Sequence, residues 1–150
     1  MTTPEQCLKL IKKYEGLSLK PYLCPAGIPT IGYGCTRYLN GAKVTMQDKD
    51  ITKDEAEALL TDLVDEFADK VVKLVPPLNP NQLSAVISFA YNVGTRALRE
   101  STLLKRIKAN PNDQTIRDEF LRWNKAGGKV LAGLTKRRQE EADLYFKEIV

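Results

Sequence analysis

One carboxylate stands alone in a stretch of the sequence that is rich in turn-forming residues. After Glu15, no Asp or Glu occurs until past Gln47, although the chain has 19 acidic residues. Cys24, Thr30 and several glycines lie in the same stretch. A single carboxyl group beside a compact, turn-rich segment is suited to donating or accepting a proton. We therefore interpret Glu15–Gly34 as an active site that the rest of the chain supports.

The segment that carries Glu15 has the pattern of an amphipathic helix. Thr3 and Gln6 form a capping-box pattern at its start, and Gly16 is placed to end it in the left-handed conformation. Glu15 follows Ile11 by four residues, which sets it at the edge of the apolar face. Partial burial there favours the protonated carboxyl, but a lone glutamate in this position is also a common helix-end charge.

A hairpin is predicted after this helix. Pro25-Ala26-Gly27 has turn composition, and residues 30–35 alternate, with Thr30, Gly32 and Gly34 on one face. Glycines on one face of a strand allow another group to approach the backbone closely, or else they permit a bent hairpin.

The rest of the chain is predicted to be helical. Thr52 and Asn79 each begin a capping-box pattern, and the helix after Asn79 is apolar almost all round, which places it at the centre of a helical lobe. The helix after Thr52 is long enough to connect two lobes. The predicted helices span residues 53–75, from 80 to about 91, 102–109, 113–123, and from near 135 to the C-terminus.

Composition narrows the possible chemistry. The 150-residue chain has no histidine, which excludes Ser/His/Asp and Cys/His catalysis. Its three cysteines lack the spacing of metal ligands, and we expect neither a metal nor a cofactor. Three is an odd number of cysteines, which favours a chain in a reducing compartment. No apolar run is long enough to span a membrane, and the N-terminus does not resemble a signal peptide. We expect no stable membrane insertion.

A basic cluster begins the last predicted helix. Lys136 and Arg137 can pair with Glu140 and Glu141 four residues on, whereas Arg138 has no acid at that spacing and is expected to find a partner elsewhere. The net charge of +4 is mild, and acids follow the cluster at once, so we do not expect nucleic-acid binding.

Taken in order, these motifs resemble those of the phage-type lysozymes, glycoside hydrolase family 24, which are the endolysins of tailed phages. The helix that ends in Glu15-Gly16 and the hairpin with Ile31-Gly32-Tyr33-Gly34 carry the resemblance in the first third of the chain. The later matches are Asn92-Val93-Gly94, Ser101-Thr102-Leu103-Leu104, Arg122-Trp123, Gly127-Gly128, Gly133-Leu134, Arg137-Arg138 and Glu141.

The resemblance implies a lysozyme-like α+β fold that is mostly α, in a single domain over residues 1–150. A small N-terminal lobe with a β-hairpin sheet (about 1–52) would be joined by a connecting helix (about 53–75) to an all-α C-terminal lobe (about 76–150). The cleft between the lobes would bind glycan strands. The implied activity is hydrolysis of the β-1,4 bond between N-acetylmuramic acid and N-acetylglucosamine in bacterial peptidoglycan, which causes host cell lysis.

The resemblance also assigns roles to single residues. The family's general acid falls on Glu15, its second catalytic residue, an aspartate, on Cys24, and its catalytic threonine on Thr30. Its substrate-binding aromatic falls on Tyr91, and Asn92 beside it would complete the floor of the cleft. Arg138 matches a family arginine that approaches the glutamate across the cleft, and we expect it to bind substrate together with Tyr91 and Asn92.

Cys24 is a departure that leaves the mechanism open. The far face of a sugar usually meets a second carboxylate, and a thiol is a weaker base. One alternative is a lytic transglycosylase, in which Glu15 serves as acid and then base and the product has 1,6-anhydro ends. Another is a non-catalytic module that binds the cell wall, although the presence of both Glu15 and Thr30 argues against it.

The resemblance and the composition together imply a setting for the enzyme. We expect a monomer that stays in the host cytoplasm until lysis and then acts on the cell wall. Because we expect no export signal, access to the wall would depend on a separate protein that forms pores in the membrane.

Overall fold

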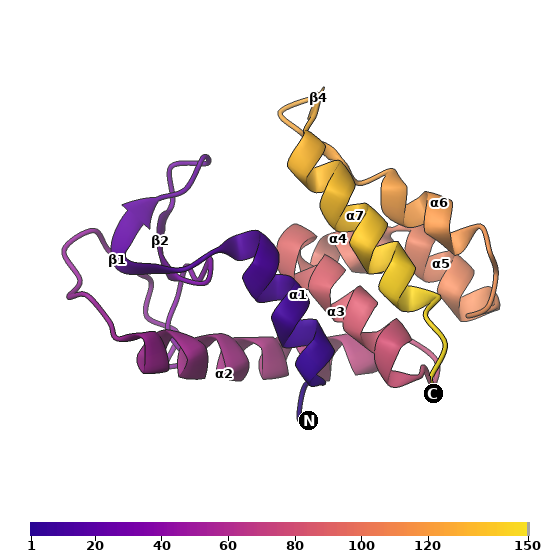
Figure 1. Cartoon of the computed structure of the whole chain (residues 1–150), viewed down its shortest axis with the longest axis horizontal. Coiled ribbons are helices and arrows are strands. Elements are labelled where there is room, and N and C mark those ends of the chain that lie inside the picture. Colours follow the sequence, from indigo (N-terminus) through magenta and orange to yellow (C-terminus); the bar gives the residue numbers. More distant parts are fainter. Residues whose placement is uncertain (150) are drawn as a thin grey trace.

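The computed structural model describes residues 1–149, and two parts of unequal size lie at the two ends of one long helix (Figure 1). A β-hairpin with its loops stands at one end, and a group of helices stands at the other. In chain order the elements are α1 (Glu5–Glu15), β1 (Ser18–Leu23), β2 (Pro29–Gly32), α2 (Lys53–Val72), α3 (Pro80–Val93), α4 (Thr95–Glu100), α5 (Thr102–Ala109), α6 (Ile116–Leu121), β3 (Lys125–Ala126), β4 (Lys129–Val130) and α7 (Ala132–Tyr145).

The first helix ends as predicted but begins differently. Gly16 follows α1 with a φ of 70°, and its N–H donates to the carbonyl of Lys12. The capping box predicted at Thr3 is absent: the backbone N–H and the hydroxyl of Thr3 both donate to Asp65 Oδ1, at 3.0 and 2.5 Å. This prediction was wrong because a partner on α2 competes successfully for the threonine side chain.

The hairpin pairs β1 with β2 in antiparallel register, with Tyr22 opposite Thr30 and an irregularity between Ser18 and Tyr22. The alternation predicted through Cys35 stops at Gly32, and the chain then turns back. Both Gly32 and Gly34 have positive φ, 66° and 73°, a region that residues with a Cβ rarely adopt. The glycines here therefore form a tight turn at the end of the strand.

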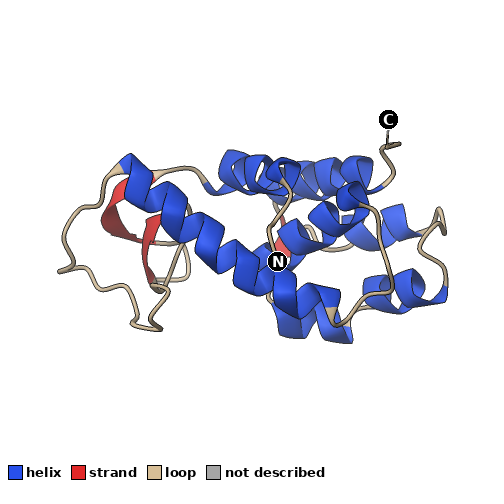
Figure 2. Ribbon diagram, turned by 90° about the horizontal axis from the view of Figure 1, so that it is seen from below, coloured by secondary structure: helices blue, strands red, loops and turns tan. Residues whose placement is uncertain are grey.

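Helix α2 connects the hairpin end to the helical end, as Figure 2 shows from below. Thr52 and Glu55 form the predicted capping box, and the helix ends at Val72, three residues before the predicted end. Its 20 residues correspond to about 30 Å. A helix of this length sets the distance between the hairpin and the helical group.

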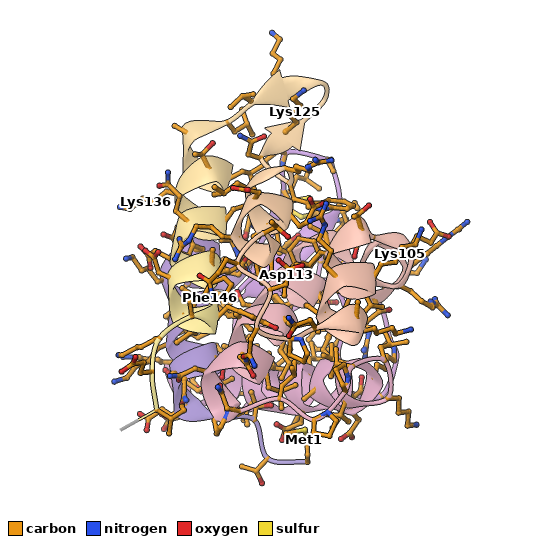
Figure 3. All side chains as sticks on the ribbon, turned by 90° about the vertical axis from the view of Figure 1, so that its right-hand side faces the viewer. Met1, Lys105, Asp113, Lys125, Lys136 and Phe146 are labelled. Carbon is orange, nitrogen blue, oxygen red and sulfur yellow. The ribbon has the colours of Figure 1, made fainter. Side chains whose placement is uncertain are left out.

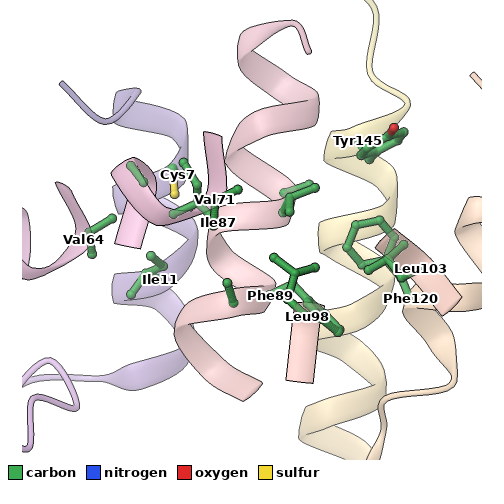
Figure 4. Close-up of a cluster of buried hydrophobic side chains, with 14 of the residues drawn as sticks. Cys7, Ile11, Val64, Val71, Ile87, Phe89, Leu98, Leu103, Phe120 and Tyr145 are labelled. Carbon is green, nitrogen blue, oxygen red and sulfur yellow. The ribbon is translucent and has the colours of Figure 1, made fainter. Parts of the chain in front are cut away.

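The helical group is built around α3. This helix starts with the predicted capping box of Asn79 and Gln82, and almost its whole first three turns are buried. Aromatic and aliphatic side chains from α1, α2 and α4–α7 surround it and include Ile11, Leu98, Phe120 and Tyr145 (Figure 4). Although α1 was assigned to the N-terminal lobe, its buried face packs on α3, so it belongs to this core as well.

The remaining differences from the predicted elements concern short segments. Helix α4 was not predicted, α6 is shorter than the predicted 113–123, and α7 begins at Ala132 instead of near Thr135. Gly127-Gly128 is the turn between β3 and β4. Among the described helices, none combines the length and apolarity that crossing a membrane requires.

Candidate active site

A cleft of about 450 Å³ lies where the hairpin faces α2 and the end of α3. It brings together residues from five separate segments of the chain. Its lining consists of Glu15, Tyr22, Cys24, Pro25, Thr30, Gly34, Thr36, Arg37, Phe67, Tyr91 and Asn92. Five of the six site residues predicted from the sequence are in this set, and the sixth, Arg138, is not.

Glu15 is the last residue of α1, and its side chain is 20% exposed. The glycine turn after β2 fits tightly against it: a Cβ on Gly34 would lie 2.3 Å from Glu15 Oε1. Only a residue without a side chain leaves room for the carboxylate in this position. The predicted close approach to a glycine is therefore real, and the group that approaches Gly34 is the candidate acid itself.

The arginine that meets Glu15 is Arg137, which corrects the expectation for Arg138. Arg137 Nη1 donates to Glu15 Oε2 at 2.7 Å, and the Arg137 side chain is almost completely buried. Successive residues of a helix point about 100° apart, so only one of two adjacent arginines can face α1. The sequence assigned Arg137 to Glu141, and this contact also exists, at 3.3 Å from Nε to Oε2.

Arg138 points into the protein core instead. It has no exposed surface, its Nε lies 2.8 Å from Glu141 Oε1, and its Nη2 donates to Asn92 Oδ1 at 2.8 Å. Contact between the Arg138 side chain and a substrate is thus excluded in this conformation. Its effect on the cleft passes through Asn92, which is exposed at the rim.

Glu141 lies between the two arginines and is fully buried. Its Oε2 also accepts a hydrogen bond from the Ser88 hydroxyl at 2.6 Å. Burial raises the pKa of this carboxyl, while the two guanidinium groups and Ser88 act in the opposite direction. A carboxylate shared by two cations in this way fixes the side chains of both arginines.

Cys24 and Thr30 lie on the hairpin side of the cleft. Thr30 is buried, and its hydroxyl donates to the carbonyl of Ile28 at 2.9 Å. The pKa of the Cys24 thiol is lowered, chiefly by hydrogen bonding from the Ile28 backbone amide, with a smaller contribution from the Ala26 amide. Backbone amides of the turn thus stabilise the thiolate here, a source that the sequence did not reveal.

A cation beside Cys24 could also lower the pKa of its thiol, but the basic residues of this segment, Lys20 and Arg37, do not do so. Arg37 lines the cleft, but its Nη2 donates to Glu66 Oε2 at 2.5 Å. Lys20 lies on β1 as an exposed residue. Neither residue appears among the groups that shift the pKa of Cys24.

Tyr91 forms the floor of the cleft and is held firmly. Its hydroxyl donates to the carbonyl of Tyr33 at 2.9 Å and lies 3.6 Å from Cys35 Sγ. Its ring packs edge-on against that of Phe67, with 5.3 Å between the two ring centroids. Burial raises the pKa of Tyr91 well above its ordinary value, so the phenol stays neutral. An uncharged aromatic floor of this kind suits the apolar face of a sugar ring.

The side chains that line the cleft indicate which kind of reaction it can support. A partly buried glutamate faces a cleft that also carries a hydroxyl, a thiol and an aromatic floor. Among residues 1–149 no group of three or more His, Cys, Asp or Glu is placed to hold a metal ion. A cleft that carries an acid together with polar groups suits protonation of a leaving-group oxygen, as in cleavage of a glycosidic bond.

The fold and the site together define a two-lobed glycosidase of the lysozyme type. The chain belongs to the phage lysozyme family, which it matches over residues 12–141. It is 42% identical to an endolysin of Acyrthosiphon pisum secondary endosymbiont phage 1, over 97% of this chain and 98% of the relative. It is also similar to a solved endolysin structure from Escherichia coli O157:H7 phage FAHEc1, with 37% identity, a TM-score of 0.87, and 99% and 96% of the two chains covered.

The length of the relatives varies. An endolysin of Bacillus phage B103 is 42% identical over 97% of this chain, yet the match spans 54% of that protein. The chain therefore spans about half the length of some relatives and nearly all of others.

Proposed function

We propose that this chain cleaves the β-1,4 bond between N-acetylmuramic acid and N-acetylglucosamine of peptidoglycan by hydrolysis, with Glu15 as general acid. Its family membership makes it a lysozyme of the endolysin class, and what we add is the bond, the mechanism and the residues. The observation that carries the proposal is the position of Glu15, which is partly buried at the wall of a sugar-sized cleft and held against Gly34.

Thr30 and Cys24 would act on the opposite face of the sugar. A hydroxyl whose proton goes to the Ile28 carbonyl keeps its lone pairs free to accept a hydrogen bond from water. We propose that Thr30, aided by Cys24, orients the attacking water. The water bonds to the anomeric carbon as the bond to the leaving oxygen breaks, and it loses its proton to solvent, so hydrolysis proceeds with inversion.

Substrate binding would involve the aromatic floor and the amide beside it. Tyr91 would pack against a sugar ring, and Asn92 would hydrogen-bond an acetamido or hydroxyl group of the glycan. Arg138 would act as a positioning residue, because it is buried and holds Asn92 Oδ1 at 2.8 Å.

One observation favours a lytic transglycosylase as a second candidate. Among the residues described as lining the cleft, Glu15 is the one acid, and such an enzyme needs no second carboxylate. The two reactions differ in their products, because transglycosylation leaves 1,6-anhydro ends and hydrolysis leaves reducing ends.

The cellular setting is also a proposal. We propose a monomer that remains in the host cytoplasm until a separate protein opens the membrane, after which it reaches the wall. The free state of Cys7, Cys24 and Cys35 supports synthesis and storage in a reducing compartment. Lysis of cells that express this chain alone, with intact membranes, would contradict the dependence on a pore.

Mass spectrometry of digested peptidoglycan tests the mechanism. The wild-type chain should release fragments with reducing N-acetylmuramic acid ends, and 1,6-anhydro ends would establish the transglycosylase instead. Glu15→Gln should retain its fold and lose activity at least 100-fold, because the amide cannot donate the proton. Residual activity above about 10% of wild type would remove Glu15 from the acid role.

A further inference from the structure

A second hollow, of about 320 Å³, lies where α2 ends and α4 begins. It is lined by Lys70, Lys73, Leu74, Thr95 and Arg99, so it carries three cations, one hydroxyl and one apolar side chain. No acidic residue is found among the described residues that line it. Three like charges around one concavity repel one another, and a bound anion would relieve this repulsion.

The acids nearest in sequence are engaged with other groups. Asp69 accepts from the N-terminal amine at 2.6 Å, Glu66 accepts from Arg37, and Glu100 accepts from Arg96 at 3.3 Å. Within residues 1–149, none of the three cations of the hollow forms an ion pair. The C-terminal dipole of α2 favours Lys70 and Lys73 in part, and that of α4 favours Arg99 in its last turn.

The hollow is adjacent to the catalytic cleft. Phe67 lines the cleft, and the Nζ of Lys70, one turn further along α2, lies 5.9 Å from the centre of the Phe67 ring. On the facing side, Asn92 lines the cleft and Thr95 lines the hollow. The two helical segments that border the cleft therefore also border the hollow, about one helical turn further on.

We propose that this hollow binds the carboxylates of the peptide stems that branch from the glycan. The inference rests on peptidoglycan as the substrate. Sugar rings in the cleft are uncharged, whereas each stem carries free carboxylates and small apolar side chains. Lys70, Lys73 and Arg99 would bind the carboxylates, Thr95 would donate its hydroxyl, and Leu74 would contact the methyl groups. Because the stems branch from the strand in the cleft, they are the nearest source of anions.

The test compares two substrates that differ in their stems, and the stem-free one carries a lactyl carboxylate on each N-acetylmuramic acid where the stem was attached. One is peptidoglycan freed of teichoic acids, and the other is the same glycan after an amidase has removed its peptides. The variant is Lys70→Gln/Lys73→Gln/Arg99→Gln. The control is Lys105→Gln/Lys108→Gln/Lys147→Gln, which removes the same charge from exposed sites elsewhere. Lys105, for example, projects from the helical group into solvent (Figure 3).

On stem-bearing glycan at low salt, kcat/KM of the variant should fall about 5- to 50-fold relative to wild type, as expected for three exposed charge pairs. On stem-free glycan the change should stay below about twofold, and at about 1 M salt the two proteins should converge. The control variant should differ from wild type equally on both substrates, and an unchanged thermal midpoint would show that the fold is kept.

Three results would overturn the inference: an equal loss on both substrates, the same stem-dependent loss in the control variant, or a loss that appears only on walls that keep their teichoic acids. The last would assign the hollow to phosphate. Binding of an isolated stem tetrapeptide, followed by NMR shifts at Thr95 and Leu74, tests the hollow without catalysis. If the wild-type chain cleaved neither glycan, the proposed reaction would be refuted. The peptide titration would still show whether the hollow binds the stems, because it does not depend on catalysis.

Discussion

Arg137 donates to Glu15 across 122 residues of sequence, at 2.7 Å from Nη1 to Oε2. The same guanidinium contacts Glu141 through Nε and the Ser88 carbonyl through Nη2, at 3.3 and 3.2 Å. Glu15, the candidate general acid, is therefore coupled through Arg137 to a buried network and is not an isolated carboxylate.

Arg137→Gln should lower activity by about tenfold or more. Without the 2.7 Å contact from Nη1, the Glu15 side chain is no longer held in place, and a shift of about 1 Å in a catalytic group is costly. The variant should also lose about 3–5 kcal/mol of unfolding free energy, because it leaves Glu141 with one partner fewer in a buried site. Activity should therefore be measured well below the thermal midpoint.

Arg138→Gln is the matched control for Arg137→Gln. Arg138 pairs with the same buried carboxylate, that of Glu141, but does not contact Glu15. The substitution therefore removes a guanidinium from Glu141 and leaves the surroundings of Glu15 unchanged. We expect a similar loss of stability and a raised KM through a misplaced Asn92, with a smaller fall in kcat than Arg137→Gln causes. If both variants lower kcat alike, the contact between Arg137 and Glu15 has no effect of its own on activity.

Gly34→Ala should displace the carboxylate of Glu15, the candidate general acid. The added Cβ would lie 2.3 Å from Glu15 Oε1, so the side chain or the turn must move. We expect activity to fall at least about tenfold, since a shift of about 1 Å in a catalytic group is costly. Gly41→Ala provides the control, because its φ of 88° imposes the same backbone strain with no atom within 4 Å of the new Cβ.

Both glycine variants should lose about 1 kcal/mol of stability from the positive φ. Only Gly34→Ala should lose activity, which a wall-turbidity assay at a fixed folded fraction would show. Equal activity in the two variants would mean that the contact between Gly34 and Glu15 has no catalytic consequence.

The Cys24 and Thr30 series separates a positioned water from a covalent step. If the two residues orient water, Cys24→Ser should keep most activity, and Cys24→Asp should keep or raise it. Thr30→Ala should cost more than Cys24→Ala. If Cys24→Ser is instead as inactive as Glu15→Gln, or if mass spectrometry detects a sugar adduct on Cys24, sulfur is the nucleophile.

Alkylation should distinguish the three thiols in the native protein. Backbone hydrogen bonds lower the pKa of Cys24, so more thiolate is present at neutral pH, whereas burial raises the pKa of Cys7 to about 12 and also raises that of Cys35. Iodoacetamide at neutral pH should modify Cys24 first, as read by peptide mass spectrometry. After unfolding without reductant, all three should react. Early modification of Cys7 would contradict the buried site.

Local patterns in the sequence determined much of this protein. The capping boxes at Thr52 and Asn79 and the end of α1 at Gly16 are interactions within a few residues, so spacing alone predicted them. The apolar faces of α1 and α3 and the isolation of Glu15 were equally readable, and the ordered motifs led to the phage lysozyme family.

Contacts between distant segments were decided only by the tertiary structure. The Thr3 hydroxyl donates to Asp65 on α2 instead of capping α1. Whether Arg137 or Arg138 contacts Glu15 depends on how α7 is rotated relative to α1. The pKa of Cys24 depends on amides that the hairpin turn directs at its sulfur, and the basic hollow requires α2 to end beside α4. Such features depend on how whole helices and strands are placed relative to one another. The packing of the core sets this placement, and the spacing of residues within one segment does not encode it.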